Sequence, residues 1–440
     1  MSVFVKRIGN PRGDKQLWML MGGPGAAGAG DEGNASAFAD ADPNLVVYLP
    51  DHRGTGRSTR LGCPVQEAAG SPAGLTITAD EWPACLVAID AVWGSALDHL
   101  GTSEAARDVG WLVQELRGTQ AVHVFGSSYG TYWGHRYLQI HPDQPDSLSL
   151  LGIAPPGFDF TVFTEQYDEA GRRFMDRCSS DPFCASRLGP DARAVTEAVM
   201  NQVDAGLCPG ALAAGLDRAT LKLYFSALLS WSGPQRAFIP AIVYRLARCS
   251  AADVAALQAA APQMADPLSG LLGDPLFSAA LNQHVSLSEM WHPPVPTLEQ
   301  AQQAAADAIF GLGSTEGRVL LSPTWPTYPH DEFVLNYAQS DVPMLMMVGE
   351  FDPNSPIELG EDFATHFGGI HQHFLEIPDG NHGFHSPTAQ GYGCAINVMF
   401  NFIQDPTGPL LDCMDDVVPI AFEGSAGMAQ GLFGTQDLYD

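Results

Sequence analysis

The stretch VHVFGSSYGTYWG, residues 122–134, constrains the fold of this chain more than any other. An apolar run leads into a group of glycines and serines, and a helix-like segment follows. A nucleophile on a sharp turn from strand to helix has a strained backbone and needs small residues two before and two after it, which gives G-x-S-x-G. Gly126 and Gly130 bracket Ser128 in this register, whereas Ser127 would place aromatic residues at both positions. The sequence therefore predicts that Ser128 stands at the apex of such a turn.

Short apolar runs alternate with helical patterns on both sides of this turn. Runs of this length, bounded by Gly, Pro or Asp, are typical of buried parallel strands. They cover residues 16–21, 44–50, 121–125, 147–153, 341–350 and 371–378. Residues 102–117 and 130–140 have helical patterns and separate some of these runs. The alternation predicts an α/β fold, with a mostly parallel sheet and helices on both of its faces.

One long segment interrupts this alternation. From residue 158 to 321 the chain is rich in alanine and mostly helical in pattern, and no buried-strand pattern recurs within it. We therefore predict that residues 1–157 and 322–440 form two parts of one α/β core. Residues 158–321 are predicted to form a mainly helical cap inserted between them.

Ser128 needs a base to take its proton, and the base needs an acid to orient it. When the nucleophile follows a strand in this way, the acid and then the histidine come later in the chain. Asp352 lies just past one late strand, and His382 lies in a Gly- and Pro-rich loop past the next. Such loops leave the carboxyl ends of parallel strands, where open α/β sheets gather their ligands. Ser128, Asp352 and His382 are therefore the predicted triad, with Glu350 and His385 as less well placed neighbours.

A tetrahedral intermediate on Ser128 would need two backbone N–H donors for its oxyanion. One donor normally comes from the residue after the nucleophile, here Tyr129. The other should come from the Gly-Gly-Pro-Gly loop, residues 22–25, which directly follows an early strand. Pro24 has no N–H, so Gly23 is the predicted second donor.

Several motifs occur together in one order along the chain. They are GGPG at 22–25, DHRGTGRS at 51–58, GSSYGT at 126–131, GEFDPNSP at 349–356 and GNHG at 380–383. With these motifs the chain resembles the tripeptidyl aminopeptidase and prolyl aminopeptidase group of α/β-hydrolase serine peptidases. Cys394 and Cys413 near the C-terminus resemble the tripeptidyl aminopeptidase branch.

The resemblance implies the α/β-hydrolase fold with a helical cap. By motif, it implies Ser128 as nucleophile, Asp352 as orienting acid and His382 as base. It also implies that Gly23 and Tyr129 form the oxyanion hole.

The same resemblance also concerns two further segments. It implies that Asp51 and Arg53 brace loops beside the site. The first loop of such proteins often begins with His, whereas this chain has Met21 there, a departure that removes no amide donor.

These residues predict a serine hydrolase that acts through an acyl-enzyme, with no metal or organic cofactor. The resemblance implies that it releases N-terminal residues or short peptides. An esterase or lipase with the same triad and a non-catalytic binding protein of hydrolase fold remain alternatives. An aminopeptidase must also bind a free α-amine, for which Glu165 and Glu169 are the candidates. Acidic residues on a helix more often only face solvent.

The charge of the chain restricts its partners. Its 50 acidic and 21 basic residues give a net charge of -29. Such a chain repels phosphate backbones and anionic lipids, so we expect a peptide or small acyl substrate and no nucleic acid. No apolar run is long enough to cross a bilayer, so no membrane insertion is expected. The oligomeric state stays open.

The eight cysteines fall into local pairs along the sequence. An even set of this kind favours disulfides and a secreted or periplasmic protein, with the connectivity left open. The N-terminal residues, MSVFVKRIGN, lack a signal-peptide pattern. A cytoplasmic enzyme with eight buried thiols is therefore the alternative.

Overall fold

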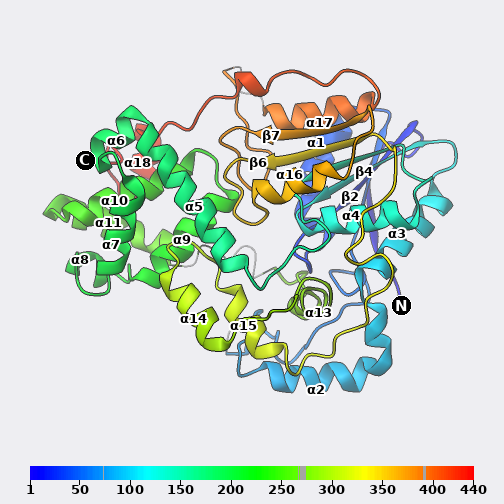
Figure 1. Ribbon diagram of the computed structural model, residues 1–440, viewed down its shortest axis with the longest axis horizontal. Helices are drawn as coiled ribbons and strands as arrows, with labels where there is room; N and C mark the ends of the chain where they lie inside the picture. Colours follow the sequence, from blue (N-terminus) through cyan, green and yellow to red (C-terminus); the bar gives the residue numbers. More distant parts are fainter. Residues whose placement is uncertain (73, 266, 268–273, 390–392) are drawn as a thin grey trace.

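The computed structural model describes residues 1–72, 74–265, 267, 274–389 and 393–440. A seven-stranded sheet runs in the order β1-β3-β2-β4-β5-β6-β7 (Figure 1). The strands are β1 (Val5–Gly9), β2 (Lys15–Leu20), β3 (Leu45–Pro50), β4 (Ala121–Ser127), β5 (Ser147–Leu151), β6 (Met344–Gly349) and β7 (Gln372–Ile377). β1 pairs antiparallel with β3, and every other pairing is parallel.

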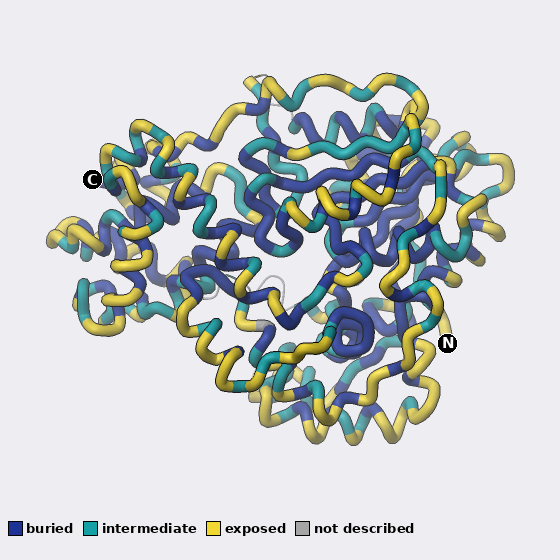
Figure 2. Tube along the Cα trace, in the orientation of Figure 1, coloured by how far each residue is buried: buried dark blue, intermediate teal, exposed yellow. Residues whose placement is uncertain are grey.

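Helices cover both faces of this sheet because its central strands are apolar on both sides. One face packs against α1 (Glu32–Ala41) and α17 (Cys394–Gln404). The other packs against α3 (Thr102–Leu116), α4 (Tyr129–Ile140) and α16 (Ile357–Thr365). Figure 2 shows the resulting buried layer running through the sheet. The prediction of a mostly parallel sheet with helices on both faces is confirmed.

The edge strand β1 was not predicted from the sequence. Its residues, VKRIG, carry two basic side chains and stay half-buried or exposed. The strand therefore lacks the continuous apolar run by which the buried parallel strands are recognised. Since it lies at the edge of the sheet, only one neighbour is needed to hold it.

A helical region lies between β5 and β6, and its described residues contain no strand. Its α-helices are α5 (Phe163–Ser180), α6 (Pro182–Leu188), α7 (Ala192–Gln202), α8 (Pro209–Leu212), α9 (Arg218–Trp231), α10 (Phe238–Arg248), α11 (Ala251–Met264), α13 (Ala279–Glu289), α14 (Leu298–Asp307) and α15 (Ser314–Leu321). A short 3-10 turn, η3 (Pro234–Ala237), joins α9 to α10. Most of these helices form a separate layer beside the sheet (Figure 1).

Two segments depart from the boundaries expected for core and cap. Within 158–321, α13 packs on the core, since Ser278 Oγ donates a hydrogen bond to the carbonyl of Leu61 (2.5 Å). Within 322–440, α18 (Ala426–Phe433) lies among the cap helices (Figure 1). Buried Arg245 of α10 donates to the carbonyl of Leu438 (2.7 Å), which holds the following segment there as well. These contacts join residues far apart in the sequence, so local patterns do not reveal them.

All eight cysteines are joined in local disulfides. The pairs are Cys63–Cys85, Cys178–Cys184, Cys208–Cys249 and Cys394–Cys413, with Cα–Cα distances of 5.3 to 5.9 Å. Disulfides persist in oxidising environments, so the four bonds indicate such an environment for this protein. In the part of the chain that is described, no helix is both long and apolar enough to cross a membrane.

Buried histidines of the core are held as neutral hydrogen-bond acceptors. His135 of α4 accepts the backbone N–H of Ala338 at Nε2 (2.9 Å). His284 of α13 accepts the indole N–H of Trp325 at Nδ1 (3.2 Å). Because an acceptor nitrogen carries no proton, protonation would break both bonds.

The unfolding free energy is therefore expected to fall as the pH drops from about 6.5 toward 4. Burial lowers the pKa of His52, His123 and His284 to about 4 and that of His135 to about 3. The unfolded chain, with histidine pKa values near 6.5, then binds protons before the folded chain does. Urea unfolding at pH 7.5, 6 and 4.5 measures this, and a constant or rising free energy would contradict it.

Candidate active site

Ser128 stands on a strained turn between β4 and α4. Its backbone angles are φ 58° and ψ −129°, a region that residues other than glycine rarely occupy. Three hydrogen bonds hold it there. The Ser128 N–H donates to the carbonyl of Leu151 (2.9 Å), and its own carbonyl accepts from Thr131 N and Oγ1 (2.8 and 2.6 Å). The neighbouring strand β5 and the first turn of α4 thus keep the serine at the apex.

The two bracketing glycines are required by close backbone contacts. A Cβ atom on Gly126 would lie 2.2 Å from the carbonyl oxygen of Gly130. A Cβ atom on Gly130 would lie 2.0 Å from the carbonyl oxygen of Leu20 in β2. Any larger residue would therefore push the turn away from the sheet.

Asp352 and His382 form a hydrogen-bonded pair. His382 Nδ1 lies 2.7 and 2.9 Å from the two carboxylate oxygens of Asp352, which is fully buried. The carboxylate also accepts the N–H groups of Asn354 (2.9 Å) and Ser355 (3.0 Å) and the Ser355 hydroxyl (3.0 Å). With Nδ1–H donated to the carboxylate, His382 Nε2 carries the lone pair that can accept a proton.

Gly152, the residue after β5, is where the serine and the Asp–His pair meet. Gly152 and Ser128 line the same pocket. A Cβ atom on Gly152 would lie 2.9 Å from the His382 ring and 3.2 Å from Asp352 Oδ2. Among the described residues no hydrogen bond joins Ser128 to His382, and such bonds often tighten only when substrate binds. The structure thus brings all three predicted triad residues to one place.

Gly23 and Tyr129 lie at the same pocket, beside Ser128. The preceding loop touches the serine, since a Cβ atom on Gly22 would lie 3.1 Å from Ser128 Oγ. Neither the Gly23 nor the Tyr129 amide donates a hydrogen bond to any residue in the described ranges. Both amides are thus available to a group bound at Ser128, as an oxyanion hole requires.

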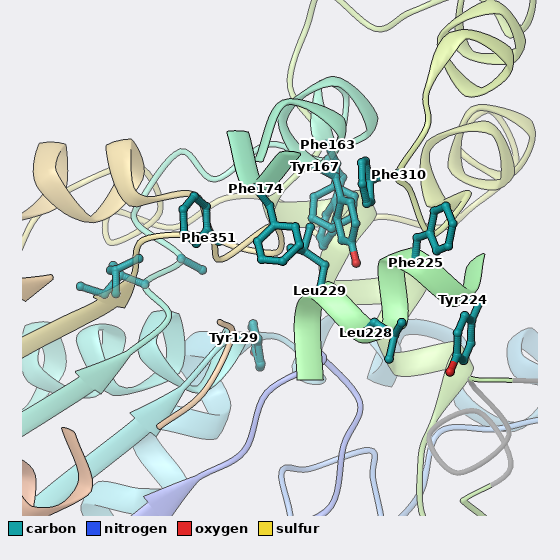
Figure 3. Close-up of a cluster of buried hydrophobic side chains, with 14 of the residues drawn as sticks. Tyr129, Phe163, Tyr167, Phe174, Tyr224, Phe225, Leu228, Leu229, Phe310 and Phe351 are labelled. Atoms are coloured by element: carbon teal, nitrogen blue, oxygen red, sulfur yellow. The ribbon is translucent and has the colours of Figure 1, made fainter. Parts of the chain in front are cut away.

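The pocket at Ser128 is small, about 60 Å³, and has a mostly apolar wall. Its wall comes from the start of the cap and the end of α13, with Phe158, Phe160, Phe163 and Met290. Figure 3 shows that Phe163 belongs to a larger aromatic cluster that fills the space between α5 and α9. No charged side chain is among the described residues that line the pocket. The described surface beside the Ser128 hydroxyl is therefore mostly apolar, with Asn354 and Ser355 as its polar residues.

A family model described as "alpha/beta hydrolase fold" matches residues 19–186, which include the Gly-Gly-Pro-Gly loop and the turn at Ser128. The sheet order, the strained turn at Ser128 and this match all indicate the same fold. The chain has the α/β-hydrolase fold. A search of curated proteins gives no match.

Several solved structures are similar to this chain over most of their length. A proline iminopeptidase from Mycobacterium smegmatis is 16% identical, covers 92% of this chain and 95% of its own, and has a TM-score of 0.40. An esterase from Thermogutta terrifontis is 15% identical, with 86% of each chain covered and a TM-score of 0.34. A monoacylglycerol lipase from Paleococcus ferrophilus is 13% identical, with 87% and 91% covered and a TM-score of 0.37. At these scores the likenesses do not indicate a substrate.

In this α/β-hydrolase fold the side-chain hydroxyl of Tyr129 is anchored by buried partners. Its hydroxyl lies 2.9 Å from Thr102 Oγ1 and 3.2 Å from His52 Nε2, and all three groups are buried. These bonds hold the first turn of α4 in place. The Tyr129 amide, next to Ser128, is held in place with it.

Asp51 and Arg53 both make bracing contacts after β3. Asp51 accepts the N–H of Gly28 (2.9 Å) and the N–H of Arg57 (2.8 Å). Arg53 forms a two-pronged ion pair with Asp108 of α3 (2.6 and 2.7 Å). Asp51 thus ties its loop to the segment that follows the Gly-Gly-Pro-Gly loop, and Arg53 ties it to α3.

Glu165 and Glu169, the candidate ligands for a substrate amine, are not brought to this pocket. Both are exposed on α5 and line a separate groove beside α14. Glu169 pairs with Arg193 of α7 (3.1 Å). The α5 residues that reach Ser128's pocket come from its opposite, apolar face, as Phe163 does.

Several residues of the site were missed from the sequence. Gly152 lies near the end of the predicted run 147–153, and a glycine at the carboxyl end of a strand beside the turn could have marked it. Asn354 and Ser355 stand within the motif that carries Asp352, but no role was assigned to them. The apolar wall has no local signature, because its residues come from two distant segments. Among the described residues no group of acidic, histidine or cysteine side chains could hold a metal ion.

Replacing Gly152 with alanine is expected to lower kcat by about 100-fold while leaving the protein folded. The new methyl group would meet the His382 ring at 2.9 Å and displace it from Asp352. Steady-state kinetics and the circular dichroism spectrum measure the two effects. Gly157→Ala is the control, because it also changes a glycine of positive φ but meets only Leu335, at 4.0 Å. An equal loss of kcat in Gly152→Ala and Gly157→Ala would contradict the expectation.

Proposed function

We propose that this protein is a serine hydrolase that transfers an acyl group to water through an acyl-enzyme. The observation that carries the proposal is the meeting of the Asp352–His382 pair and Ser128 at Gly152. Ser128 is the proposed nucleophile, His382 the base and Asp352 the group that orients the imidazole.

The reaction runs in two halves. In the first, Ser128 Oγ attacks the substrate carbonyl carbon while His382 Nε2 takes the hydroxyl proton. The amides of Gly23 and Tyr129 stabilise the oxyanion, and His382 returns the proton to the leaving group as its bond to carbon breaks. In the second half, a water molecule attacks the acyl-enzyme and gives its proton to His382 Nε2. His382 passes this proton to Ser128 Oγ as the bond between Oγ and the acyl carbon breaks and the acid is released.

Exopeptidase action on an N-terminal residue or short peptide is the proposed activity. The cap bears on this proposal, because Phe158, Phe160 and Phe163 from its start line the pocket at Ser128 and so narrow the space beside the nucleophile. The four disulfides support action outside the cytoplasm. The strongly acidic chain would attract the amino ends of peptides.

Carboxylic ester hydrolysis is a second candidate, favoured by one observation. The described lining of the pocket holds no carboxylate that could pair with a free α-amine. An amine one residue from the cleaved bond would therefore lie in apolar surroundings, which disfavour a charge. An ester of an apolar acid would meet no such cost.

A substrate panel distinguishes the two activities. It compares aminoacyl and tripeptidyl amides with free amines, the same amides with blocked amines, and acyl esters of matched size. The exopeptidase proposal expects turnover of free-amine amides and little of blocked ones. Turnover of esters alone would support the second candidate, and no turnover of any class would support a binding protein instead.

A further inference from the structure

Ser230 lies at the end of cap helix α9, next to the loop that carries His382. Its backbone carbonyl accepts the N–H of His382 (3.1 Å). The last carbonyls of a helix have no partner within the helix, so this one is free to bind the loop. Ser230 is fully buried, as is Ser226 one turn earlier.

The Ser230 side chain contacts the other catalytic loop. Its Oγ accepts the side-chain N–H of Asn354 (2.9 Å). Asn354 in turn donates its backbone N–H to Asp352 Oδ1 (2.9 Å). One residue of the cap therefore binds the loop of the acid through its hydroxyl and the loop of the base through its carbonyl.

Tyr167 of α5 fixes the direction of the Ser230 hydroxyl. The Tyr167 hydroxyl donates to the carbonyl of Ser226 (2.8 Å) and lies 2.5 Å from Ser230 Oγ. A tyrosine has one hydroxyl proton, so Ser230 must donate its own proton to Tyr167. The Ser230 lone pairs are then left for Asn354. Figure 3 shows Tyr167 extending from α5 to α9.

More of the His382 loop rests on the same stretch of the cap. Asn381 donates its side-chain N–H to the carbonyl of Ser232 (3.0 Å). Buried Arg236 of η3 donates to the carbonyl of Asp379. The cap segment 230–236 therefore supports the loop from Asp379 to His382.

We propose that Ser230 is a positioning residue that holds Asp352 and His382 in register, with Tyr167 orienting its hydroxyl. The inference rests on the proposed serine-hydrolase function and adds that the cap is part of the catalytic geometry. If the hydroxyl is lost, the loop of Asp352 is no longer tied to α9, while the His382 loop still is. The imidazole and its acid would then shift relative to each other and to Ser128.

The test compares Ser230→Ala with Ser226→Ala. The first variant loses the bonds to Asn354 and Tyr167 but keeps the carbonyl bond to His382. In the second, the removed hydroxyl is equally buried on the same helix, but among the described residues it bonds only to Lys222 and Gly311. For Ser230→Ala we expect kcat and the rate of fluorophosphonate labelling to fall about 10- to 100-fold with KM little changed. Ser226→Ala should lower the melting temperature and keep both rates.

Tyr167→Phe is the second variant, in case Ser230→Ala does not fold. It removes one hydroxyl, keeps the ring packed, and should slow labelling in the same direction by about 10-fold or less. Wild-type labelling rates in both Ser230→Ala and Tyr167→Phe, or equal slowing in Ser226→Ala, would overturn the proposal. Failure of the wild-type protein to be labelled would instead overturn the proposed serine-hydrolase function.

Discussion

Replacing Ser128 with alanine is expected to lower kcat by about four orders of magnitude or more and to abolish labelling by a fluorophosphonate probe. The variant loses the proposed nucleophile but keeps the amides of Gly23 and Tyr129, so binding of an acyl substrate should change little. The turn itself should persist, because its hydrogen bonds use the Ser128 backbone. Steady-state kinetics and gel detection of the probe measure both effects.

Ser127→Ala is the matched control. Ser127 is adjacent in sequence and is the last residue of β4, so its side chain does not stand at the apex of the turn. The variant should keep the labelling and most of the activity. Loss of labelling in Ser127→Ala but not in Ser128→Ala would show that the nucleophile has been assigned to the wrong serine.

Replacing Arg136 with methionine is expected to lower the unfolding free energy by about 3–5 kcal/mol, because a carboxylate would be left buried without its partner. Arg136 of α4 donates to Glu289 at the end of α13 (3.0 Å), and both side chains are buried. Tyr132 and Tyr328 donate to the same carboxylate (2.9 and 2.5 Å), so the ion pair is the centre of a polar network. Urea unfolding measures the loss.

Two further variants test the cause. Arg107→Met removes a partly exposed ion pair with Glu104 on the core helix α3 and should cost less than about 1 kcal/mol. Adding Glu289→Gln to Arg136→Met should restore part of the lost free energy, since no charge then stays buried alone. If Arg136→Met lowers the unfolding free energy no more than Arg107→Met does, then leaving Glu289 buried without its arginine does not have the expected cost.

The sheet and the turn at Ser128 could be predicted because their causes are local. A parallel strand buried on both faces needs a continuous apolar run, and the turn needs glycines at fixed offsets. Ser128, Asp352 and His382 follow from the ends of such strands, and the structure places them together. The edge strand β1 has no such run, and it was missed.

Residues that depend on distant contacts could not be predicted in this way. Ser230 looks like any serine of an amphipathic helix until α9 is placed beside the His382 loop. Met290 reaches the pocket only because α13 returns to the core. Glu165 and Glu169 were predicted from charge alone, and the structure shows that the face of α5 opposite the pocket carries them.

The path of the C-terminal segment limits how the cap can be exchanged. Helix α18 and the residues after it pack among cap helices, where Arg245 holds the carbonyl of Leu438. A chimera that transplants only residues 158–321 onto another hydrolase would therefore expose the surface that α18 covers and leave the Arg245 guanidinium without that acceptor. The transplanted unit has to include residues 426–440. It has to leave out α13, which packs on the core, so that the recipient keeps its own core residues at that place.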